Sequence, residues 1–176
     1  MSGDVKYSVN PSGEKFPIPQ KSDYQQEFER LQSLTQRARS EGKEIVVVMG
    51  VGFVGAVMAA IVADTRDGNG KNSKFVIGCQ RPSARSYWKI PMLNRGESPV
   101  KAEDPEVDTL IKRCVKESKT LVATYNSDCL MLADTVIVDV QCDYQKKDLG
   151  NMRTGEADMA ALEATMRTIG ENIVWC

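Results

Sequence analysis

Three glycines at G-x-G-x-x-G spacing are the residues of this chain with the clearest chemical use. Gly50, Gly52 and Gly55 follow an apolar run and precede an alanine-rich segment, the strand–turn–helix setting in which this spacing binds a dinucleotide. The first glycine allows a tight turn, the second lets the backbone approach a pyrophosphate, and the third lets the helix pack on the strand. The N–H groups that open the helix then donate to phosphate oxygens. The spacing predicts a dinucleotide site, with glycines that serve only the turn as the alternative.

The residue types that the chain lacks narrow the chemistry further. The 176 residues include no histidine, which excludes Ser-His and Cys-His nucleophiles and removes the commonest metal ligand. The five cysteines are odd in number and have no C-x-x-C spacing, so we expect reduced thiols, no disulfide framework and no metal site. Any reaction must therefore use Cys, Lys, Asp, Glu or a cofactor.

Charge and hydropathy exclude several classes of partner. The formal net charge is −1, with acidic and basic residues interspersed, which predicts no nucleic-acid partner and no anionic membrane surface. No apolar run approaches the roughly 20 residues of a membrane span, and the first residues have no signal-peptide pattern. We therefore expect a cytoplasmic protein. A mass of 19.5 kDa fits one domain, which is small for a dehydrogenase that binds two substrates.

The segment before the glycine turn is predicted to be a polar extension over residues 1–43. Its first twenty residues hold three prolines and are expected to be extended or disordered. An amphipathic helix should follow, capped by Ser22 or Asp23, and should end before Lys43. Tyr24, Phe28, Leu31 and Leu34 recur at helical spacing, which puts them on a face that docks on the domain or on a neighbouring subunit.

Apolar runs and helical patterns alternate over residues 44–176, the part predicted to form the dinucleotide-binding domain. The fold class is therefore α/β, with a Rossmann-type doubly wound parallel sheet in a single, apparently truncated domain. Strands are expected at 45–49, 75–79, 120–124 and 135–140, and helical segments at 56–63, 90–93, 105–113, 128–133 and 158–172. A loop is expected at 141–155, and a further strand from residue 173.

Three segments resemble a known family over about three quarters of the chain. They are residues 48–55 around the glycines, 90–99 with a Leu-Asn-x-Gly-x-x-Pro pattern, and 133–140 with Ala-Asp before an apolar strand. The second pattern is much more specific than the glycine turn. The chain is similar to the N-terminal NAD-binding domain of the UDP-glucose/GDP-mannose dehydrogenases, which are nucleotide-sugar dehydrogenases.

This resemblance implies an enzyme that oxidises the C6 alcohol of a nucleotide-linked sugar twice, to the uronic acid, with NAD as acceptor. The family's catalytic cysteine holds the aldehyde as a thiohemiacetal, which requires no histidine. That cysteine, a lysine and the sugar-binding residues fall beyond Cys176 in the family pattern. The resemblance therefore implies no catalytic residue in this chain, a nucleotide-sugar substrate for the complete enzyme, and a homo-oligomer when complete. Neither the sugar nor the subunit number follows from the sequence.

The resemblance also assigns cofactor-binding residues. The pyrophosphate would lie against Gly50, Val51, Gly52, Phe53, Val54 and Gly55, with Thr124 and Cys142 along the cofactor toward the nicotinamide. At the adenosine end the family's usual acid is replaced by Gln80, followed by Arg81. Gln80 can bond a ribose hydroxyl, whereas Arg81 could pair with a 2′-phosphate, stack on adenine or lie in solvent. NAD is the expected cofactor, with NADP not excluded.

Two other functions remain open at this point. One is a stand-alone NAD-binding regulatory module that engages a partner through the face of Tyr24, Phe28 and Leu31. The other is an inactive fragment in which the glycines only form the turn. The apolar residues 173–176 favour a truncated chain, because they would leave an unfinished sheet edge. Cys142 lacks the glycine-rich setting of the family's catalytic cysteine and is interpreted as a small hydrophobic residue.

Overall fold

A computed structural model describes residues 5–146 and 155–173. Within them, four parallel strands form the central sheet, and two small antiparallel hairpins lie outside it. The elements in chain order are β1 Tyr7–Val9, β2 Lys15–Pro17, α1 Asp23–Ser40, β3 Glu44–Met49, α2 Phe53–Ala63, β4 Lys74–Cys79, α3 Lys89–Asn94, α4 Glu106–Lys112, the π-helical turn η1 Arg113–Glu117, β5 Leu121–Thr124, the 3-10 helix η2 Ser127–Leu132, β6 Thr135–Val138, β7 Asp143–Lys146, β8 Gly155–Asp158 and α5 Ala160–Asn172.

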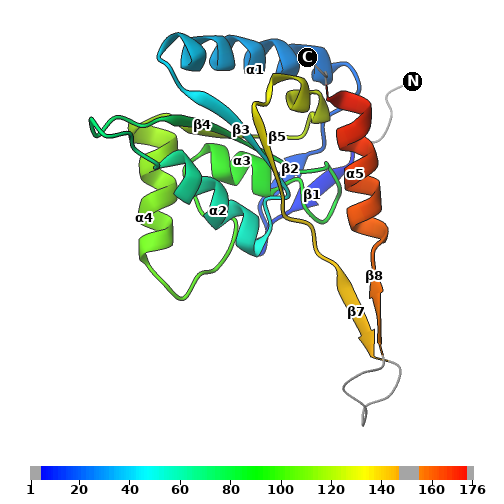
Figure 1. Ribbon diagram of the computed structural model, residues 1–176. Coiled ribbons are helices and arrows are strands. Elements are labelled where there is room, and N and C mark those ends of the chain that lie inside the picture. The colour runs from blue at the N-terminus through cyan, green and yellow to red at the C-terminus, as the bar shows by residue number, and fades with distance from the viewer. Residues whose placement is uncertain (1–4, 147–154, 174–176) are drawn as a thin grey trace.

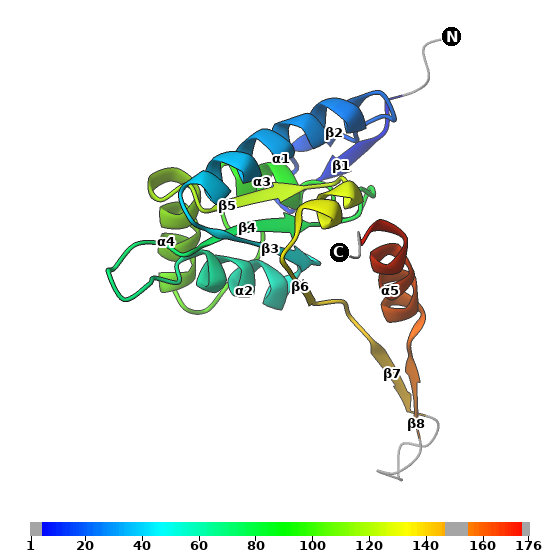
Figure 2. The same ribbon diagram turned by 45° about the horizontal axis from the view of Figure 1, so that its top comes forward.

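The strand order is β5-β4-β3-β6, and all three neighbouring pairs are parallel. The chain moves outward from β3 through β4 to β5 and then returns to place β6 on the other side of β3. Figure 2 shows the sheet between α1 on one face and α2 on the other. This arrangement confirms the predicted α/β fold with a doubly wound, Rossmann-like sheet. The strand order reverses between β3 and β6. Sheets of this type bind ligands at that point, outside the carboxyl ends of the strands.

The sheet is buried on both faces because its strands are almost wholly apolar. Along β3, Val46 and Val48 pack against the face covered by α2, whereas Ile45 and Val47 pack against the face covered by α1. Alternation of side chains across a strand produces this division. The buried face of α2 is formed by alanines and a glycine, so the helix approaches the sheet closely. The α2 face also receives α3 and α4, and the α1 face receives η2 and α5.

Helix α1 forms where the sequence predicts it and docks on the domain itself. It starts at Asp23, after Ser22, and ends before Gly42, whose φ of +78° turns the chain toward β3. Leu31 and Ala38 are buried in the same core cluster as Ile45. The residues on either side of the predicted boundary at residue 43 therefore share one core.

Residues 5–20 are more ordered than expected. β1 and β2 pair as an antiparallel hairpin, which corrects the expectation of an extended or disordered segment. The Asn10 side chain accepts hydrogen bonds from the N–H groups of Ser12 and Glu14, at 3.1 and 2.8 Å. The Ser8 hydroxyl then donates to the Ala84 carbonyl at 2.9 Å. The β1–β2 hairpin is therefore held by hydrogen bonds within its own turn and by a contact with a distant part of the chain. Its composition alone does not predict strands.

The C-terminal part also differs from the expected pattern. The predicted loop at 141–155 contains β7, which pairs with β8 in a hairpin that extends away from the sheet (Figure 1). β6 ends at Val138, two residues before the predicted end, and α5 begins at Ala160 rather than Asp158. A strand was predicted over residues 173–176, of which 174–176 lie outside the described residues.

Two polar side chains form hydrogen bonds with the backbone of the sheet strands. The Asn94 amide donates to the Ala123 carbonyl at 2.9 Å, and its oxygen accepts from the Ala123 N–H at 2.7 Å. It thereby pairs with the edge strand β5 as a neighbouring strand would. Asp134 accepts from the Ile45 N–H at 2.8 Å and forms an ion pair with Arg39, which links the start of β6 to β3 and α1. These contacts give structural roles to the Leu-Asn and Ala-Asp patterns in the sequence.

Candidate functional site

Packing requires two of the three glycines in the turn after β3. Gly50 has a φ of +100°, and a Cβ placed there would lie 1.9 Å from the Asp139 carbonyl oxygen. A Cβ on Gly55 would lie 2.0 Å from the Gly50 carbonyl oxygen. Both atoms belong to the backbone, so neither contact could be relieved by a side-chain movement. These glycines allow β3, β6 and the start of α2 to meet closely.

Gly52 has no such packing role. Its φ of −76° lies outside the left-handed region that favours glycine, and a Cβ there would meet no atom within 4 Å. Nothing in the described part of the chain therefore calls for a glycine at this position. The open space beside it is what a pyrophosphate would need in order to approach the backbone.

The start of α2 has the character of an anion site. The helix has no side-chain cap and no acidic residue in its first turn, so its opening N–H groups and partial positive charge are not satisfied by a cap. The side chains of Phe53 and Val54 are 65% and 52% exposed. The Val51 side chain is buried, and its N–H donates to Gln80 Oε1 at 3.1 Å. This bond fixes Gln80 beside the glycine turn.

A cavity of about 510 Å³ opens at the carboxyl ends of the strands. Four of the predicted cofactor residues line it together: Gly50, Gly52, Gln80 and Arg81. The other six predicted residues do not line it: Val51, Phe53, Val54, Gly55, Thr124 and Cys142. Thr124 is fully buried, and its hydroxyl donates to Glu27 of α1 at 2.6 Å, whereas Cys142 is exposed beyond the end of β6.

Several residues that line the cavity were not predicted as site residues. Tyr24 and Tyr125 are two of them, with ring centroids 5.1 Å apart in an edge-to-face arrangement. Burial raises the pKa of Tyr125 to about 12, so its phenol stays protonated, and it donates to the Asp23 carbonyl oxygen at 3.2 Å. Helix α5 contributes Thr165 and Thr168. Tyr125 could have been found, because it directly follows a predicted strand at the edge where ligands bind.

Asp139 is the acidic residue that lines this cavity. It follows β6, and its Oδ2 lies 2.6 Å from the position that a Cβ on Gly55 would occupy. A carboxylate here is close to the N-terminus of α2, where it opposes part of the positive end of the helix dipole. The sequence placed Asp139 within a predicted strand and offered no sign of this position.

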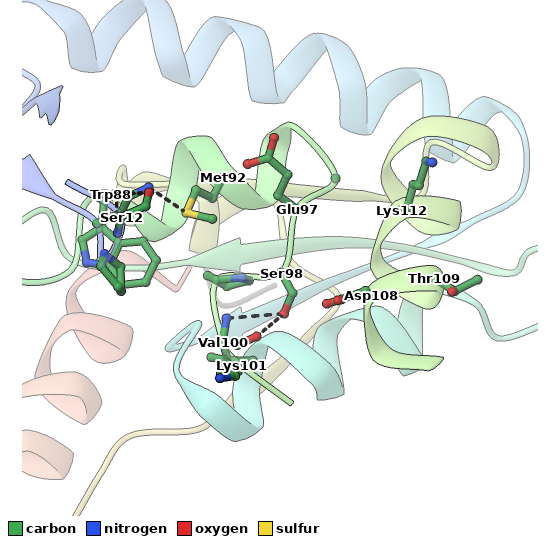
Figure 3. A pocket seen from close by; sticks show the side chains of 14 residues that line it. Ser12, Trp88, Met92, Glu97, Ser98, Val100, Lys101, Asp108, Thr109 and Lys112 are labelled. Atoms are coloured by element: carbon green, nitrogen blue, oxygen red, sulfur yellow. Dashed lines mark hydrogen bonds between the residues drawn. The ribbon is translucent and has the colours of Figure 1, made fainter. Parts of the chain in front are cut away.

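A second cavity, of about 640 Å³, lies between the β1–β2 turn, α3, the loop at 96–101 and α4. Figure 3 shows Trp88 and Met92 at one end of it and Lys112 at the other. The Ser98 hydroxyl donates to the carbonyl oxygen of Val100 and accepts from its N–H. These bonds shape the loop at 96–101. None of the glycines of the turn after β3 lines this cavity. A ligand bound there could not use that turn.

The described thiols, within residues 5–146 and 155–173, are three buried ones and the exposed thiol of Cys142. No group of three or more His, Cys, Asp or Glu side chains there is arranged to hold a metal ion. Cys79, Cys114 and Cys129 are buried and free, and burial raises the pKa of the Cys114 thiol to about 11. A buried neutral thiol is a poor nucleophile. In the same residues, no helix is long and apolar enough to cross a membrane.

Comparison with solved structures shows what this arrangement resembles. The NDP-N-acetyl-D-galactosaminuronic acid dehydrogenase of Methanosarcina mazei Go1 superposes with a TM-score of 0.62 and 32% identity, over 81% of this chain and 27% of that one. The chain resembles the N-terminal portion of nucleotide-sugar dehydrogenases. This confirms the resemblance predicted from the sequence.

Two further nucleotide-sugar dehydrogenases have the same fold. A UDP-glucose dehydrogenase from Pyrobaculum islandicum matches 74% of this chain and 26% of its own length, with 20% identity and a TM-score of 0.55. The UDP-D-ManNAc dehydrogenase of Pyrococcus horikoshii matches 72% and 25%, with 24% identity and a TM-score of 0.52. The chain thus spans about a quarter of the length of these relatives. No protein-family model and no curated protein matches it.

Proposed function

We propose that this chain is the dinucleotide-binding portion of a nucleotide-sugar 6-dehydrogenase. The complete enzyme would oxidise the C6 alcohol of a UDP- or GDP-linked sugar to the uronic acid, with NAD or NADP as acceptor. The observation that carries the proposal is Gly52, because its missing side chain leaves open space in the cavity and the fold itself does not require it. The resemblance to nucleotide-sugar dehydrogenases supports the substrate class.

The glycine turn and the cavity beside it both have a role in this proposal. The N–H groups of Phe53 and Val54 would donate to the pyrophosphate, and Gly50 would keep the turn tight. Gln80 and Arg81 would contact the adenosine ribose, with Tyr24 and Tyr125 as the aromatic surface near the adenine. When bound, the nicotinamide accepts a hydride from the substrate carbon.

The remaining aspects of the proposal follow from the same residues. No residue of this chain is assigned to catalysis, and Cys142 lies outside the cavity lining, so the chain should bind the cofactor without turnover. The buried free thiols of Cys79, Cys114 and Cys129 favour a reducing compartment, and we propose the cytoplasm. We also propose that the complete enzyme is a homo-oligomer.

Isothermal titration of the chain with NAD and NADP tests the proposal, after circular dichroism shows that the chain is folded. Saturable binding of either dinucleotide is expected. Gly52→Val should fold normally and lose this binding, because its side chain fills the space left for the pyrophosphate. Gly68→Val is the matched control, since Gly68 is also open but lies in the loop before β4. A folded chain that binds neither dinucleotide would overturn the proposal and leave the glycines as scaffold.

A further inference from the structure

The end of β4 lacks the group that NAD normally requires there. In dinucleotide-binding folds an acid at this position accepts hydrogen bonds from the ribose hydroxyls and repels a 2′-phosphate. This chain instead has Gln80 and Arg81, both of which line the cavity. Neither side chain carries a negative charge, so the repulsion that excludes NADP is absent.

The hydrogen bond of Gln80 determines what it can offer to a ligand. Its Oε1 accepts from the Val51 N–H at 3.1 Å, so the amide nitrogen is the part left for the cavity. That nitrogen forms no hydrogen bond within residues 5–146 and 155–173. An NH₂ group donates, and although a ribose hydroxyl can accept such a bond, a charged phosphate oxygen accepts it more strongly.

Cations gather on the same side of the cavity. Lys89, the first residue of α3, lines the cavity together with Arg81, and Arg85 lies on the loop between them. None of the three forms an ion pair with another described residue. Between Asp67 and Glu97 the sequence holds six Lys or Arg residues and no Asp or Glu. Of these six, Lys74 and Arg95 pair with glutamates, whereas Arg81 and Lys89 are the ones that line the cavity.

The nearby carboxylates do not neutralise this side. Asp139 lines the cavity but follows β6, which is separated from β4 by β3. Glu27 is held by Arg30 at 2.7 Å and by the Thr124 hydroxyl at 2.6 Å. Neither carboxylate forms an ion pair with Arg81 or Lys89 within residues 5–146 and 155–173.

From this arrangement we propose that the site after β4 binds the 2′-phosphate of NADP, through Gln80, Arg81 and Lys89, and that the chain prefers NADP to NAD. The inference rests on the proposed function. Arg81 and Lys89 supply charge-assisted hydrogen bonds to the phosphate, and Gln80 donates a further bond. NAD offers a hydroxyl at the same place and lacks the charge that these residues match.

Parallel titrations of the chain with NADP and NAD at low and high salt test the inference. NADP should bind about tenfold more tightly or better at low salt, because each charge-assisted bond to the phosphate adds to its affinity alone. Its affinity should also fall more steeply with salt. Arg81→Ala should remove most of the preference, because it should weaken the binding of NADP much more than that of NAD. Arg66→Ala is the matched control, since Arg66 is exposed in the loop after α2 and does not line the cavity.

A second variant separates charge from loss of contact. Gln80→Glu keeps the acceptor for Val51 and adds the missing carboxylate, so it should weaken NADP, strengthen NAD and reverse the preference. Equal or tighter binding of NAD by the unaltered chain would overturn the inference and leave the proposed function intact. Binding of neither dinucleotide by the folded chain would overturn both.

Discussion

At the scale of single residues, Asp139 is the side chain least suited to the proposed ligand. Its carboxylate lines the cavity near the first turn of α2, where the pyrophosphate would bring two negative charges. Two like charges a few ångströms apart repel by about 1 kcal/mol even where water screens them. Asp139 therefore lowers the affinity that the glycine turn provides.

We predict that Asp139→Asn strengthens dinucleotide binding roughly fivefold, the equivalent of about 1 kcal/mol. The substitution keeps the size of the side chain and removes only its charge. Titration of the variant with NAD and NADP measures the effect. Glu103→Gln serves as control, because Glu103 is exposed and lines neither cavity. Weaker binding by the Asp139→Asn variant would mean that the carboxylate takes part in binding the ligand.

At the scale of elements, the edge strand β5 depends on a side chain from α3. Asn94 forms two hydrogen bonds with the backbone of Ala123, and Ala123 is fully buried. Loss of the side chain leaves a buried N–H and a buried carbonyl without hydrogen-bond partners. Water cannot readily take the place of the lost partner, because Ala123 is buried. The position of β5 in the sheet is thus fixed by a residue outside it.

We predict that Asn94→Ala lowers the free energy of unfolding by about 2–4 kcal/mol, measured by urea denaturation. Asn94→Asp should also destabilise the fold, because a carboxylate accepts from the Ala123 N–H but cannot donate to its carbonyl oxygen. Asn69→Ala, in the exposed loop before β4, should change stability by no more than about 0.5 kcal/mol. An Asn94→Ala variant as stable as this control would show that β5 does not depend on Asn94.

Elements could be predicted from the sequence where hydrophobic pattern alone determines them. The short β-branched runs at Ile45 and Phe75, bounded by turn residues, indicate buried strands, and the glycines between β3 and α2 give the turn its form. The β1–β2 hairpin depends instead on the Asn10 side chain and on contacts with residues about 80 positions away. The polar strand β8 has no alternating pattern. Neither the long-range contacts of the β1–β2 hairpin nor the pairing of a polar strand such as β8 produces a periodic hydrophobic pattern in the sequence.

At the scale of the whole molecule, buried acids make stability depend on pH in the alkaline range. Burial raises the pKa of Cys114 from its ordinary value of 9.0 to about 11 and that of Tyr125 from 10.0 to about 12. The unfolded chain loses these protons at lower pH than the folded chain. Their contribution to stability is therefore complete below about pH 9 and is lost progressively toward pH 11 and 12.

We predict that Cys114→Ala makes the decline in stability between about pH 9 and 11 shallower. The thiol donates to the Ala60 carbonyl oxygen at 3.3 Å, a contact that ionisation would reverse into repulsion. Urea midpoints measured across this range give the slope, which is independent of any constant loss from the smaller side chain. Cys142→Ala, at an exposed position, should keep the original slope. An unchanged slope in the Cys114→Ala variant would assign the alkaline loss to other groups.

The candidate site was predicted only in part, because half of its wall comes from outside the βαβ unit. The glycines, Gln80 and Arg81 follow from their place after β3 and β4. Tyr24 comes from α1 and Thr165 from α5, and their positions depend on how those helices dock. Thr124 was correctly placed at the end of a predicted strand. Its hydroxyl nevertheless donates to Glu27 and is not available to a ligand.

The contact between α1 and the end of β5 has a consequence for how the molecule folds. Tyr125 and Asn126 bond the backbone of Asp23 and Tyr24 across 102 residues of chain. Contacts so distant in sequence cost the most chain entropy to form. We therefore expect the cavity to be completed late, after β3, β4 and β5 have assembled. A dinucleotide that binds only the completed cavity should then retard unfolding without speeding folding.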